Sequence, residues 1–369
     1  GKTTAIQMII AALETLEFSY YLASPTGRAA KRLGEATGRK AQTIHRLLGY
    51  SPQEGFLYNE SYPLKTNMVI IDEASMMDVL LFYQLLRALP DDAHLMLVGD
   101  VDQLPSVGAG YVLHDVIHSG RAHVTRLNQI FRQREKSHIV INAHRVNQGQ
   151  VPYTDNNSDD FFFFGAEEPQ QAADLIVDIV ANRLPAKFGV DPIDDVQVIA
   201  PMYRGAIGVN TLNERLQSIL NSDSRAASIK IGPRTFRVGD KVMQTRNDYD
   251  REIFNGDIGR IYGIDYEEKI LIVNIDGRLI NYRIPEDTDA LIHAYCISTH
   301  RSQGAEYPVV VMPVLYHHYI MLQRNLLYTA ITRAKQVVVL VGQRKAIHYA
   351  VQNNKVAERF SGLLHRLKS

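Results

Sequence analysis

Two short polar motifs carry residue types that are suited to phosphate chemistry, and the first of them opens the chain. Gly1-Lys2-Thr3-Thr4 matches the last part of the phosphate-binding loop G-x-x-x-x-G-K-S/T. In that loop, backbone N–H groups surround phosphate oxygens, the lysine reaches the β- and γ-phosphates, and the hydroxyl binds Mg²⁺. The motif therefore predicts a nucleotide site that is formed by Gly1, Lys2, Thr3 and Thr4.

The second motif places two carboxylates after an apolar segment. Asp72 and Glu73 follow Met68–Ile71, whose length and composition predict a buried strand. At such a position one carboxylate can bind Mg²⁺ and the next can polarise a water molecule. A helix start and a capping carboxylate would explain each motif separately, but they explain neither the order nor the spacing. Together the motifs favour a nucleoside triphosphatase in which Thr3 and Asp72 hold the metal ion.

A third polar segment follows the apolar run at 94–98. Residues 99–108 read Gly-Asp-Val-Asp-Gln-Leu-Pro-Ser-Val-Gly, and open α/β sheets bind ligands where a strand ends in such a loop. Gln103 is a candidate to contact both a γ-phosphate and the attacking water. A turn stabilised by Asp100 and Pro105 is the alternative, and the segment alone does not decide between the two.

Two arginines are candidates for stabilising the charge that develops on a transferred phosphoryl group. Arg132 follows the first group of predicted strands and helices, and Arg333 lies at the end of a predicted helix in the second group. A single arginine is more often a surface charge, so both assignments depend on the surrounding motifs.

The elements that must position these residues alternate along the chain. Apolar segments of strand length are followed by segments with helical spacing, which predicts a mainly parallel α/β sheet. In the first group the strands are 20–23, 68–71, 94–98 and 124–127, and the helices are 3–17, 77–89 and 109–118. In the second group the strands are 161–164, 196–200, 294–298, 309–313 and 336–341, and the helices are 170–182, 209–220, 322–332 and 344–351.

Two stretches interrupt this alternation. Residues 232–290 contain short strand patterns separated by turns such as Asn255-Gly256 and Asp276-Gly277, which predict a small antiparallel barrel. Residues 50–67 are rich in Gly, Pro, Asn and Tyr, and predict a projecting hairpin or loop. The expected domains are 1–148 with the 50–67 insertion, 149–231 together with 291–369, and the barrel at 232–290.

The composition is that of an ordinary soluble globular protein, with 46% apolar and 22% charged residues among 369. Lysine plus arginine equals aspartate plus glutamate at 40 each, so a nucleic-acid partner would need a local basic surface. No apolar run reaches the roughly 18 residues of a membrane span. The single Cys296 excludes an internal disulfide and suits a reducing cytosol. A cytoplasmic location is therefore expected.

The order of the motifs resembles that of superfamily-1 helicases, and among these the RecD-like DNA helicases of bacteria. Beside the two phosphate motifs, the resemblance rests on Ser24–Arg28, Thr43–His45, Gly99–Gly108, Ile130–Gln133, Ala200–Gly205, Ser298–Glu306 and Tyr328–Lys335. Asn142–Arg145 and Phe254–Asp257 resemble the RecD-like branch in particular. The segment before the phosphate loop, which in this family holds the adenine base, is missing. The sequence is therefore expected to be a fragment that begins inside that loop.

The resemblance implies two RecA-like domains that bind ATP, an inserted SH3-like barrel, and a short pin at 50–67 against which a duplex splits. It implies that Lys2 and Thr3 contact the phosphates and Mg²⁺, that Asp72 binds Mg²⁺, and that Glu73 activates water. The residues that would read the γ-phosphate are Gln103, Arg132 and Arg333. The residues that would touch the nucleotide from the second domain are Gly304 and Glu306.

The resemblance also implies single-stranded DNA as the track, movement in the 5′-to-3′ direction, and a role in bacterial DNA repair or recombination. The residues that would hold the strand are Thr26, Gly27, Arg28, Thr43 and His45 in the first domain and Thr299, His300 and Ser302 in the second. Hydroxyls, backbone amides and an arginine are suitable contacts for a phosphate backbone. An RNA helicase of the same superfamily and a passive single-strand-binding module that cannot hold ATP are the alternatives.

Overall fold

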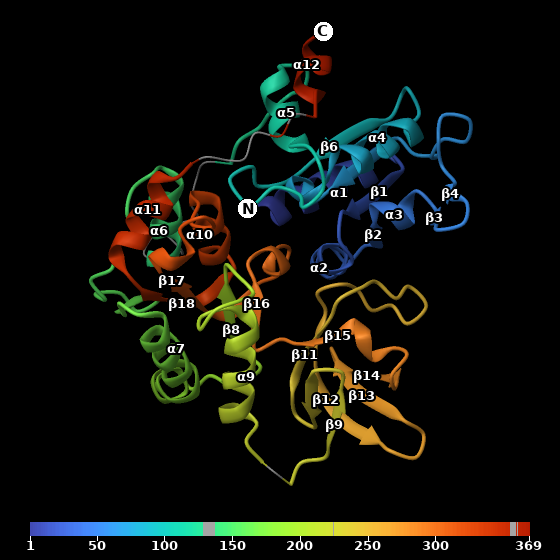
Figure 1. Ribbon diagram of the computed structural model, residues 1–369. Coiled ribbons are helices and arrows are strands. Elements are labelled where there is room, and N and C mark those ends of the chain that lie inside the picture. The colour runs from blue at the N-terminus through green and yellow to red at the C-terminus, as the bar shows by residue number, and fades with distance from the viewer. Residues whose placement is uncertain (128–136, 224, 355–358, 360) are drawn as a thin grey trace. The chain divides into compact units, whose positions relative to one another are not determined.

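The computed structural model describes residues 1–127, 137–223, 225–354, 359 and 361–369. The chain divides into two compact units, which consist of Gly1–Arg134 with Val356–Ser369 and of Glu135–Lys355. Both units contain a parallel sheet with helices, and the elements are labelled in Figure 1. None of the described helices has the length and apolarity that crossing a bilayer demands.

The sheet of the first unit has the strand order β2-β1-β5-β6, and every neighbouring pair is parallel. Its strands are β1 (Tyr20–Ser24), β2 (Ala41–Thr43), β5 (Met68–Ile71) and β6 (His94–Leu97). Its helices are α1 (Lys2–Thr15), α2 (Gly27–Thr37), α3 (Ile44–Leu47), α4 (Val79–Ala88), α5 (Val112–Ser119) and α12 (Leu363–Lys368). Because the strands are parallel, their carboxyl ends meet at one edge, where open α/β sheets bind ligands.

The apolar run at 68–71 is continuous because β5 is covered on both faces. Ile70 packs with Ile6 and Ile10 of α1 on one face of the sheet. Val69 and Ile71 belong to the core cluster on the other face, together with residues of α4 and α5. The side chains of a strand alternate between its faces, so this one short segment joins two apolar layers.

The sheet of the second unit has the order β16-β8-β17-β18-β7 and is also parallel throughout. Its strands are β7 (Phe161–Gly165), β8 (Val196–Ala200), β16 (Cys296–Ser298), β17 (Tyr307–Val314) and β18 (Ala334–Gly342). Its main helices are α6 (His138–Asn147), α7 (Pro169–Asp178), α8 (Leu184–Phe188), α9 (Val209–Leu220), α10 (Arg324–Ile331) and α11 (Arg344–Gln352). A π-helical segment, Ile179–Arg183, connects α7 to α8.

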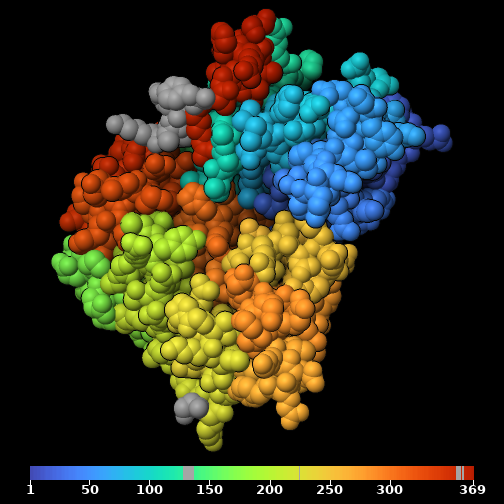
Figure 2. All heavy atoms as spheres, turned by 45° about the vertical axis from the view of Figure 1, so that its right-hand side comes forward, coloured from blue at the N-terminus to red at the C-terminus, as the bar shows by residue number. Residues whose placement is uncertain are grey.

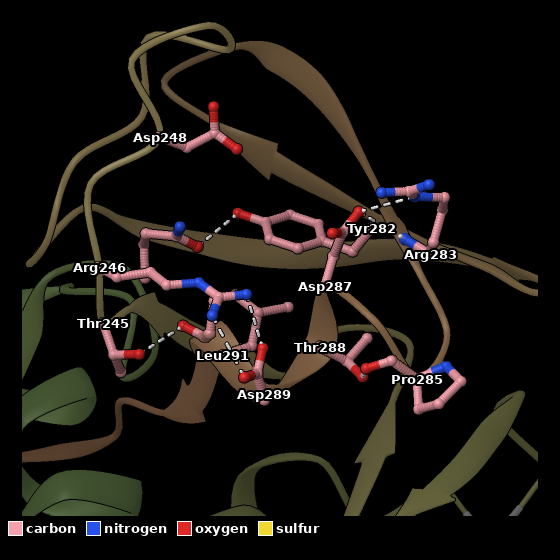
Figure 3. A network of polar contacts seen from close by, with 12 residues as sticks. Thr245, Arg246, Asp248, Tyr282, Arg283, Pro285, Asp287, Thr288, Asp289 and Leu291 are labelled. Atoms are coloured by element: carbon pink, nitrogen blue, oxygen red, sulfur yellow. Dashed lines mark hydrogen bonds and ion pairs between the residues drawn. The ribbon is translucent and has the colours of Figure 1, made fainter. Parts of the chain in front are cut away.

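The inserted barrel is an antiparallel sheet in the order β14-β13-β12-β11-β15, with a separate β9–β10 hairpin. The strands are β9 (Ser228–Ile231), β10 (Arg234–Arg237), β11 (Lys241–Gln244), β12 (Ile258–Asp265), β13 (Ile270–Ile275), β14 (Arg278–Arg283) and β15 (Leu291–His293). The antiparallel strands predicted for 232–290 are confirmed, and they extend a few residues beyond both limits of that range. Figure 3 shows the buried Tyr282, whose hydroxyl donates to Gln244 Oε1 at 2.9 Å.

A buried carboxylate, Asp240, joins the barrel to the rest of the second unit. Asp240 is fully buried and accepts hydrogen bonds from Gln217 Nε2 at 2.6 Å, Asn221 Nδ2 at 2.7 Å and Tyr295 Oη at 2.9 Å. His293 Nε2 lies 3.3 Å from the same carboxylate. Burial alone would raise the pKa of Asp240, but the hydrogen bonds from His293, Asn221 and a backbone N–H outweigh it and lower that pKa.

The two compact units divide the chain differently from the expected domains. Helix α6 was expected in the first domain, but it packs against α10, and Asn142 Oδ1 accepts the Tyr153 N–H at 2.8 Å in the second unit. The final helix α12 was expected in the second domain, but it packs against α5 of the first unit. Helical spacing predicts that a segment buries one face, but it does not say against which sheet.

The prediction of a strand at 124–127 is wrong. These residues are irregular, and both Val124 and Leu127 are exposed. A short apolar pattern predicts a strand only where a sheet offers it a neighbour. In the described part of the first unit, β6 is the last strand of the sheet.

Candidate functional site

The chain turns sharply where β5 ends. The Asp72 N–H still donates to Ala23 O at 2.9 Å and thereby extends the pairing with β1, whereas the Ala74 N–H donates to Val98 O at 2.8 Å. Between them Glu73 has a φ of 53°, in the left-handed region that side-chain-bearing residues rarely adopt. The turn therefore brings two adjacent carboxylates to the carboxyl edge of the sheet at some cost in backbone strain.

Four buried oxygens at this edge have no hydrogen-bond partner among the described residues. They are Asp72 Oδ1, Glu73 Oε2, Ser24 Oγ and Ser75 Oγ. The register of β1 and β5 pairs Ala23 with Ile71, so Ser24 lies beside Asp72. A buried oxygen without a partner costs about 1–3 kcal/mol. Several such oxygens in one place fit a site where a bound cation, water or phosphate completes their bonding.

The electrostatics of the edge point to the same conclusion. Burial raises the pKa of the Asp72 carboxyl, the charge of Glu73 raises it further, and the charge of Lys2 opposes the rise. The Lys2 ammonium is therefore within electrostatic reach of Asp72. An oxygen-ligated divalent cation would offset the repulsion between the two carboxylates.

Helix α1 directs its amino end to this region. The first intrahelical bond runs from the Ala5 N–H to Gly1 O at 3.0 Å, so the N–H groups of Lys2, Thr3 and Thr4 have no acceptor within the helix. Its first turn contains no acidic residue. An amino end of this kind, with a lysine in it and exposed hydroxyls on Thr3 and Thr4, is suited to bind phosphate.

The loop after β6 passes close to the Asp-Glu turn and contains Gln103. Gln103 is buried, and its Nε2 donates to Asp100 Oδ2 at 3.0 Å. A side chain added at Gly99 would approach the backbone nitrogens of Ala74 and Ser75 to 3.2 and 3.1 Å, so the loop lies close to that turn. Asp100 therefore does stabilise a turn here, which was the structural alternative to a phosphate contact by Gln103. The same hydrogen bond orients the Gln103 amide.

The predicted DNA contacts of the first unit lie at the amino ends of two neighbouring helices. Thr26 Oγ1 accepts the Ala29 N–H at 3.4 Å and caps α2, whose first residue is Gly27. Thr43 Oγ1 accepts the Arg46 N–H at 3.1 Å and caps α3. Each hydroxyl still has a proton to donate to a phosphate oxygen, and Arg28 follows in the first turn of α2.

His45 is part of an aromatic cluster with the inserted hairpin. Its ring centroid lies 5.5 Å from that of Tyr50 and 5.8 Å from that of Phe56, which belong to β3 (Tyr50–Ser51) and β4 (Gly55–Phe56). Burial lowers the pKa of His45 and the charge of Asp78 opposes this, so a neutral ring is favoured. The hairpin region is on the surface of the unit, where Figure 2 shows it in light blue, and Tyr50 is 47% exposed.

In the second unit, the predicted nucleotide and DNA residues surround the loop after β16. Thr299 is buried and its Oγ1 has no partner in the described part of the chain, whereas Ser302 Oγ donates to Thr299 O at 2.7 Å. His300 is exposed, and Gly304 has a φ of 70°. Glu306 lies 3.6 Å from Lys335 Nζ. The hydroxyl of Ser302 is thus used within the turn, while that of Thr299 is not.

Arg333 is held inside its own unit. It is buried, and its guanidinium donates to Thr329 O at 3.2 Å, to Ala305 O at 3.1 Å and to Thr332 Oγ1 at 3.3 Å. A guanidinium has five N–H groups, so these contacts leave some for a further acceptor. They also tie the end of α10 to the loop that carries Gly304 and Glu306. Arg132, the other candidate arginine, lies outside the described residues.

The structure thus brings Lys2, Asp72 and Glu73 together in the first unit, with Gln103 on the loop that passes close to Ala74 and Ser75. In the second unit it joins Arg333 to the loop after β16. Sequence reasoning assigned no role to Ser24 or Ser75, although Ser24 begins the Ser24–Arg28 motif and Ser75 lies two residues after Glu73. No group of three or more His, Cys, Asp or Glu residues among those described could hold a metal ion by itself. A metal at Asp72 would therefore complete its coordination with water and phosphate oxygens, as Mg²⁺ commonly does.

Comparisons with protein families match three parts of the chain in order. Residues 1–109 match an AAA domain, residues 212–275 match the SH3 domain of ATP-dependent RecD-like DNA helicases, and residues 293–341 match a UvrD-like helicase C-terminal domain. The second match covers most of the barrel, and the third covers the loop after β16, all of α10 and most of β18.

Two curated relatives match the whole chain. It is 36% identical to the ATP-dependent RecD2 DNA helicase of Deinococcus radiodurans and 30% identical to the RecBCD enzyme subunit RecD of Mycobacterium tuberculosis. The chain spans about half of the first relative, at 49% of its length, and 69% of the second.

Solved structures show the same fold. Pif1 helicases in a structure concerned with DNA unwinding at forked double-stranded DNA give a TM-score of 0.57 at 20% identity, over 92% of this chain and 85% of theirs. Pif1 helicase from Bacteroides in complex with ADP-AlF3 and single-stranded DNA gives 0.52 at 18% identity, over 87% and 82%.

Proposed function

This chain belongs to the RecD-like DNA helicases of superfamily 1, and we propose that it couples ATP hydrolysis to movement along single-stranded DNA. The observation that carries the proposal is the carboxyl edge of the first sheet. There the amino end of α1, two adjacent carboxylates and several buried oxygens without partners meet at one place.

The proposal gives each residue of that edge a task. The free N–H groups of α1 and the Lys2 ammonium bind the β- and γ-phosphates. Thr3 and Asp72 would hold Mg²⁺, which would neutralise charge on the phosphates. The Glu73 carboxylate accepts a proton from the attacking water. The water oxygen then bonds to the γ-phosphorus, the bond from that phosphorus to the bridging oxygen breaks, and ADP and phosphate are formed.

Several further residues are assigned to the same nucleotide. Gln103, held by Asp100, orients the attacking water and senses the γ-phosphate. Arg132 and Arg333 stabilise the charge of the transferred group. From the second unit, Gly304 and Glu306 contact the nucleotide. The existing contacts of Arg333 with its own α10 support a guanidinium that is fixed in place before it meets phosphate.

The proposed track is a DNA single strand next to a duplex junction. Its phosphates are bound by the hydroxyls and amides at the amino ends of α2 and α3, and by Arg28. His45 lies against the aromatic rings of Tyr50 and Phe56, and the insertion at 50–67 that carries both rings acts as the pin. Thr299, His300 and Ser302 hold the strand in the second unit. The proposal includes 5′-to-3′ movement and a role in DNA repair or recombination in the bacterial cytoplasm.

The substitution Glu73→Gln tests the catalytic part of this proposal. In the full-length protein it should lower ATP hydrolysis stimulated by single-stranded DNA by about a hundredfold or more, because the general base is lost. Binding of a fluorescent DNA oligonucleotide should be unchanged. Glu214→Gln, at an exposed position on α9, is the matched control. Hydrolysis by Glu73→Gln at the wild-type rate would refute the assignment.

Two measurements separate the alternatives. An RNA helicase would be stimulated by an RNA oligonucleotide at least as strongly as by DNA of the same sequence, because the 2′-hydroxyl distinguishes them. A passive binding module would retain the oligonucleotide but show no nucleotide binding in a titration with a fluorescent ATP analogue. A DNA helicase should bind the nucleotide and respond more strongly to DNA.

A further inference from the structure

The segment after the second unit returns to the first unit. Residues 356–369 belong to the first unit, although they follow α11 in the chain. Helix α12 packs against α5, Leu363 contacts the core cluster of α4 and α5, and Arg121 Nε donates to Leu367 O at 2.9 Å. We call Arg359 and residues 361–369 the returning segment.

Arg359 binds one loop through three backbone carbonyls. Its Nη1 lies 2.6 Å from Ser106 O, 2.7 Å from Gly108 O and 3.1 Å from Gly110 O. Hydrogen bonds from a charged donor are stronger than those between neutral groups. One guanidinium therefore holds the carbonyl oxygens of Ser106, Gly108 and Gly110 close to one another. Without it, the partial negative charges of these oxygens would repel.

The same loop is fixed on its opposite side by the start of α4. The Val79 N–H donates to Ala109 O at 2.9 Å. A side chain at Gly108 would come within 2.3 Å of Asp78 Oδ2, so the backbone lies directly on the residue that caps α4. The backbone of this loop is thus bound both by the start of α4 and by Arg359, and these contacts restrict its conformation.

Gln103 lies at the start of this loop, three residues before Ser106. Its amide is held by Asp100, and the Tyr111 hydroxyl at the far end of the loop donates to Val101 O at 2.9 Å. The two ends of the loop are therefore bound to each other across 101–111. Gln103 and the residues 106–110 that Arg359 binds therefore belong to one closed loop.

We propose that Arg359 is a positioning residue for Gln103, so that the returning segment completes the ATPase site of the first unit. This inference rests on the proposed function. Loss of Arg359 should slow the chemical step and leave nucleotide binding largely intact.

The substitution Arg359→Met removes the guanidinium, and with it the hydrogen bonds to three carbonyl oxygens, and roughly keeps the side-chain length. We expect kcat for DNA-stimulated ATP hydrolysis to fall about tenfold to a hundredfold, because small misplacements of catalytic groups have effects of this size. KM for ATP should stay within about twofold of the wild type. Arg359→Lys, which keeps one charged donor group, should recover part of the loss. Arg366→Met, at an exposed position on α12, is the matched control.

A double-mutant cycle with Gln103→Ala distinguishes positioning from a general structural role. If Arg359 acts through Gln103, the double variant should be no slower than Gln103→Ala alone, because coupled residues are not additive. Fully additive losses, or an Arg359→Met rate equal to that of Arg366→Met, would overturn the inference. Should Arg359→Met fail to fold, Arg359→Lys in the same cycle decides the matter. A wild-type protein without ATPase activity would instead refute the proposed function.

Discussion

Two carboxylates, the half-buried Asp72 and the fully buried Asp240, lie at strand ends but in opposite surroundings. Asp240 accepts hydrogen bonds from Gln217, Asn221 and Tyr295, whereas Asp72 Oδ1 has no partner among the described residues. Both side chains are removed from most solvent. A carboxylate whose bonding is complete stabilises the folded chain, and one whose bonding is incomplete costs stability until a ligand arrives. This difference predicts a structural role for Asp240 and supports the proposal that Asp72 binds a ligand.

The pKa shifts of the two groups have opposite signs. Hydrogen bonds lower the pKa of Asp240 in spite of its burial, and burial next to Glu73 raises that of Asp72. A lowered pKa means that the charged form contributes stability above the ordinary value of 3.8, which is lost as the pH falls through the lowered pKa. A raised pKa means that the charged form lowers stability at neutral pH, and the penalty disappears as the pH falls toward 3.8.

The largest effect in this comparison is expected for Asp240→Asn. The substitution removes the negative charge and turns two N–H donors toward groups that already donate, so the free energy of unfolding should fall by about 3 kcal/mol or more. Urea unfolding at neutral pH measures it. Asp250→Asn, at an exposed position in the barrel, should leave stability unchanged. Equal losses in the two variants would remove the distinction on which the comparison rests.

For Asp72→Asn we expect a smaller change in the free energy of unfolding, and of opposite sign. Without ligand, the variant should be more stable than the wild type by about 1 kcal/mol at neutral pH, because the substitution removes a half-buried charge that lies next to Glu73 and has one oxygen without a partner among the described residues. The advantage should shrink as the pH is lowered toward 3.8. Thermal unfolding at several pH values measures both.

The same variant should lose its response to ligand. Mg²⁺ with ADP should raise the melting temperature of the wild type, since a ligand that binds only the folded state stabilises it. Asp72→Asn should show little of that increase, whereas Asp92→Asn, at an exposed loop position, should behave as the wild type. If Asp72→Asn is less stable than the wild type and responds fully to Mg²⁺ and ADP, Asp72 is a structural residue like Asp240.

The smallest effect is expected for a charge pair that is exposed rather than buried. Arg246 and Asp289 lie on the barrel surface, 2.7 Å apart, and their side chains are 55% and 66% exposed (Figure 3). Arg246→Ala should change the free energy of unfolding by less than about 0.5 kcal/mol, because solvent screens such pairs. Urea unfolding checks this. If Arg246→Ala lowered the free energy of unfolding as much as Asp240→Asn, burial would not explain the difference between the exposed pair and Asp240.

Much of the fold and part of the site could be predicted from local patterns. The segment Met68–Ile71 predicts a strand because both of its faces are apolar, and the motif at Lys2 predicts a helix start beside phosphate. Such signals are contained within a few consecutive residues. The strand at 124–127 could not be judged in this way, since an apolar pattern does not show whether a neighbouring strand is present.

The remaining features depend on residues that are far apart in the sequence. Asp240 is bound by Gln217 and Tyr295, and Arg359 is bound to carbonyls about 250 positions earlier in the chain. A single sequence contains no record of such pairs. Ser24 and Ser75 were overlooked for a related reason, because only burial shows that their hydroxyls lack a partner.

The left-handed backbone at Glu73 has a consequence for how such a protein changes over generations. Glycine adopts this conformation without cost, whereas another residue there costs about 1–2 kcal/mol. A single base change converts either glutamate codon into a glycine codon. With the catalytic role proposed for Glu73, a more stable but inactive variant would therefore lie one base change away. Only selection for ATP hydrolysis would then keep the carboxylate at this position.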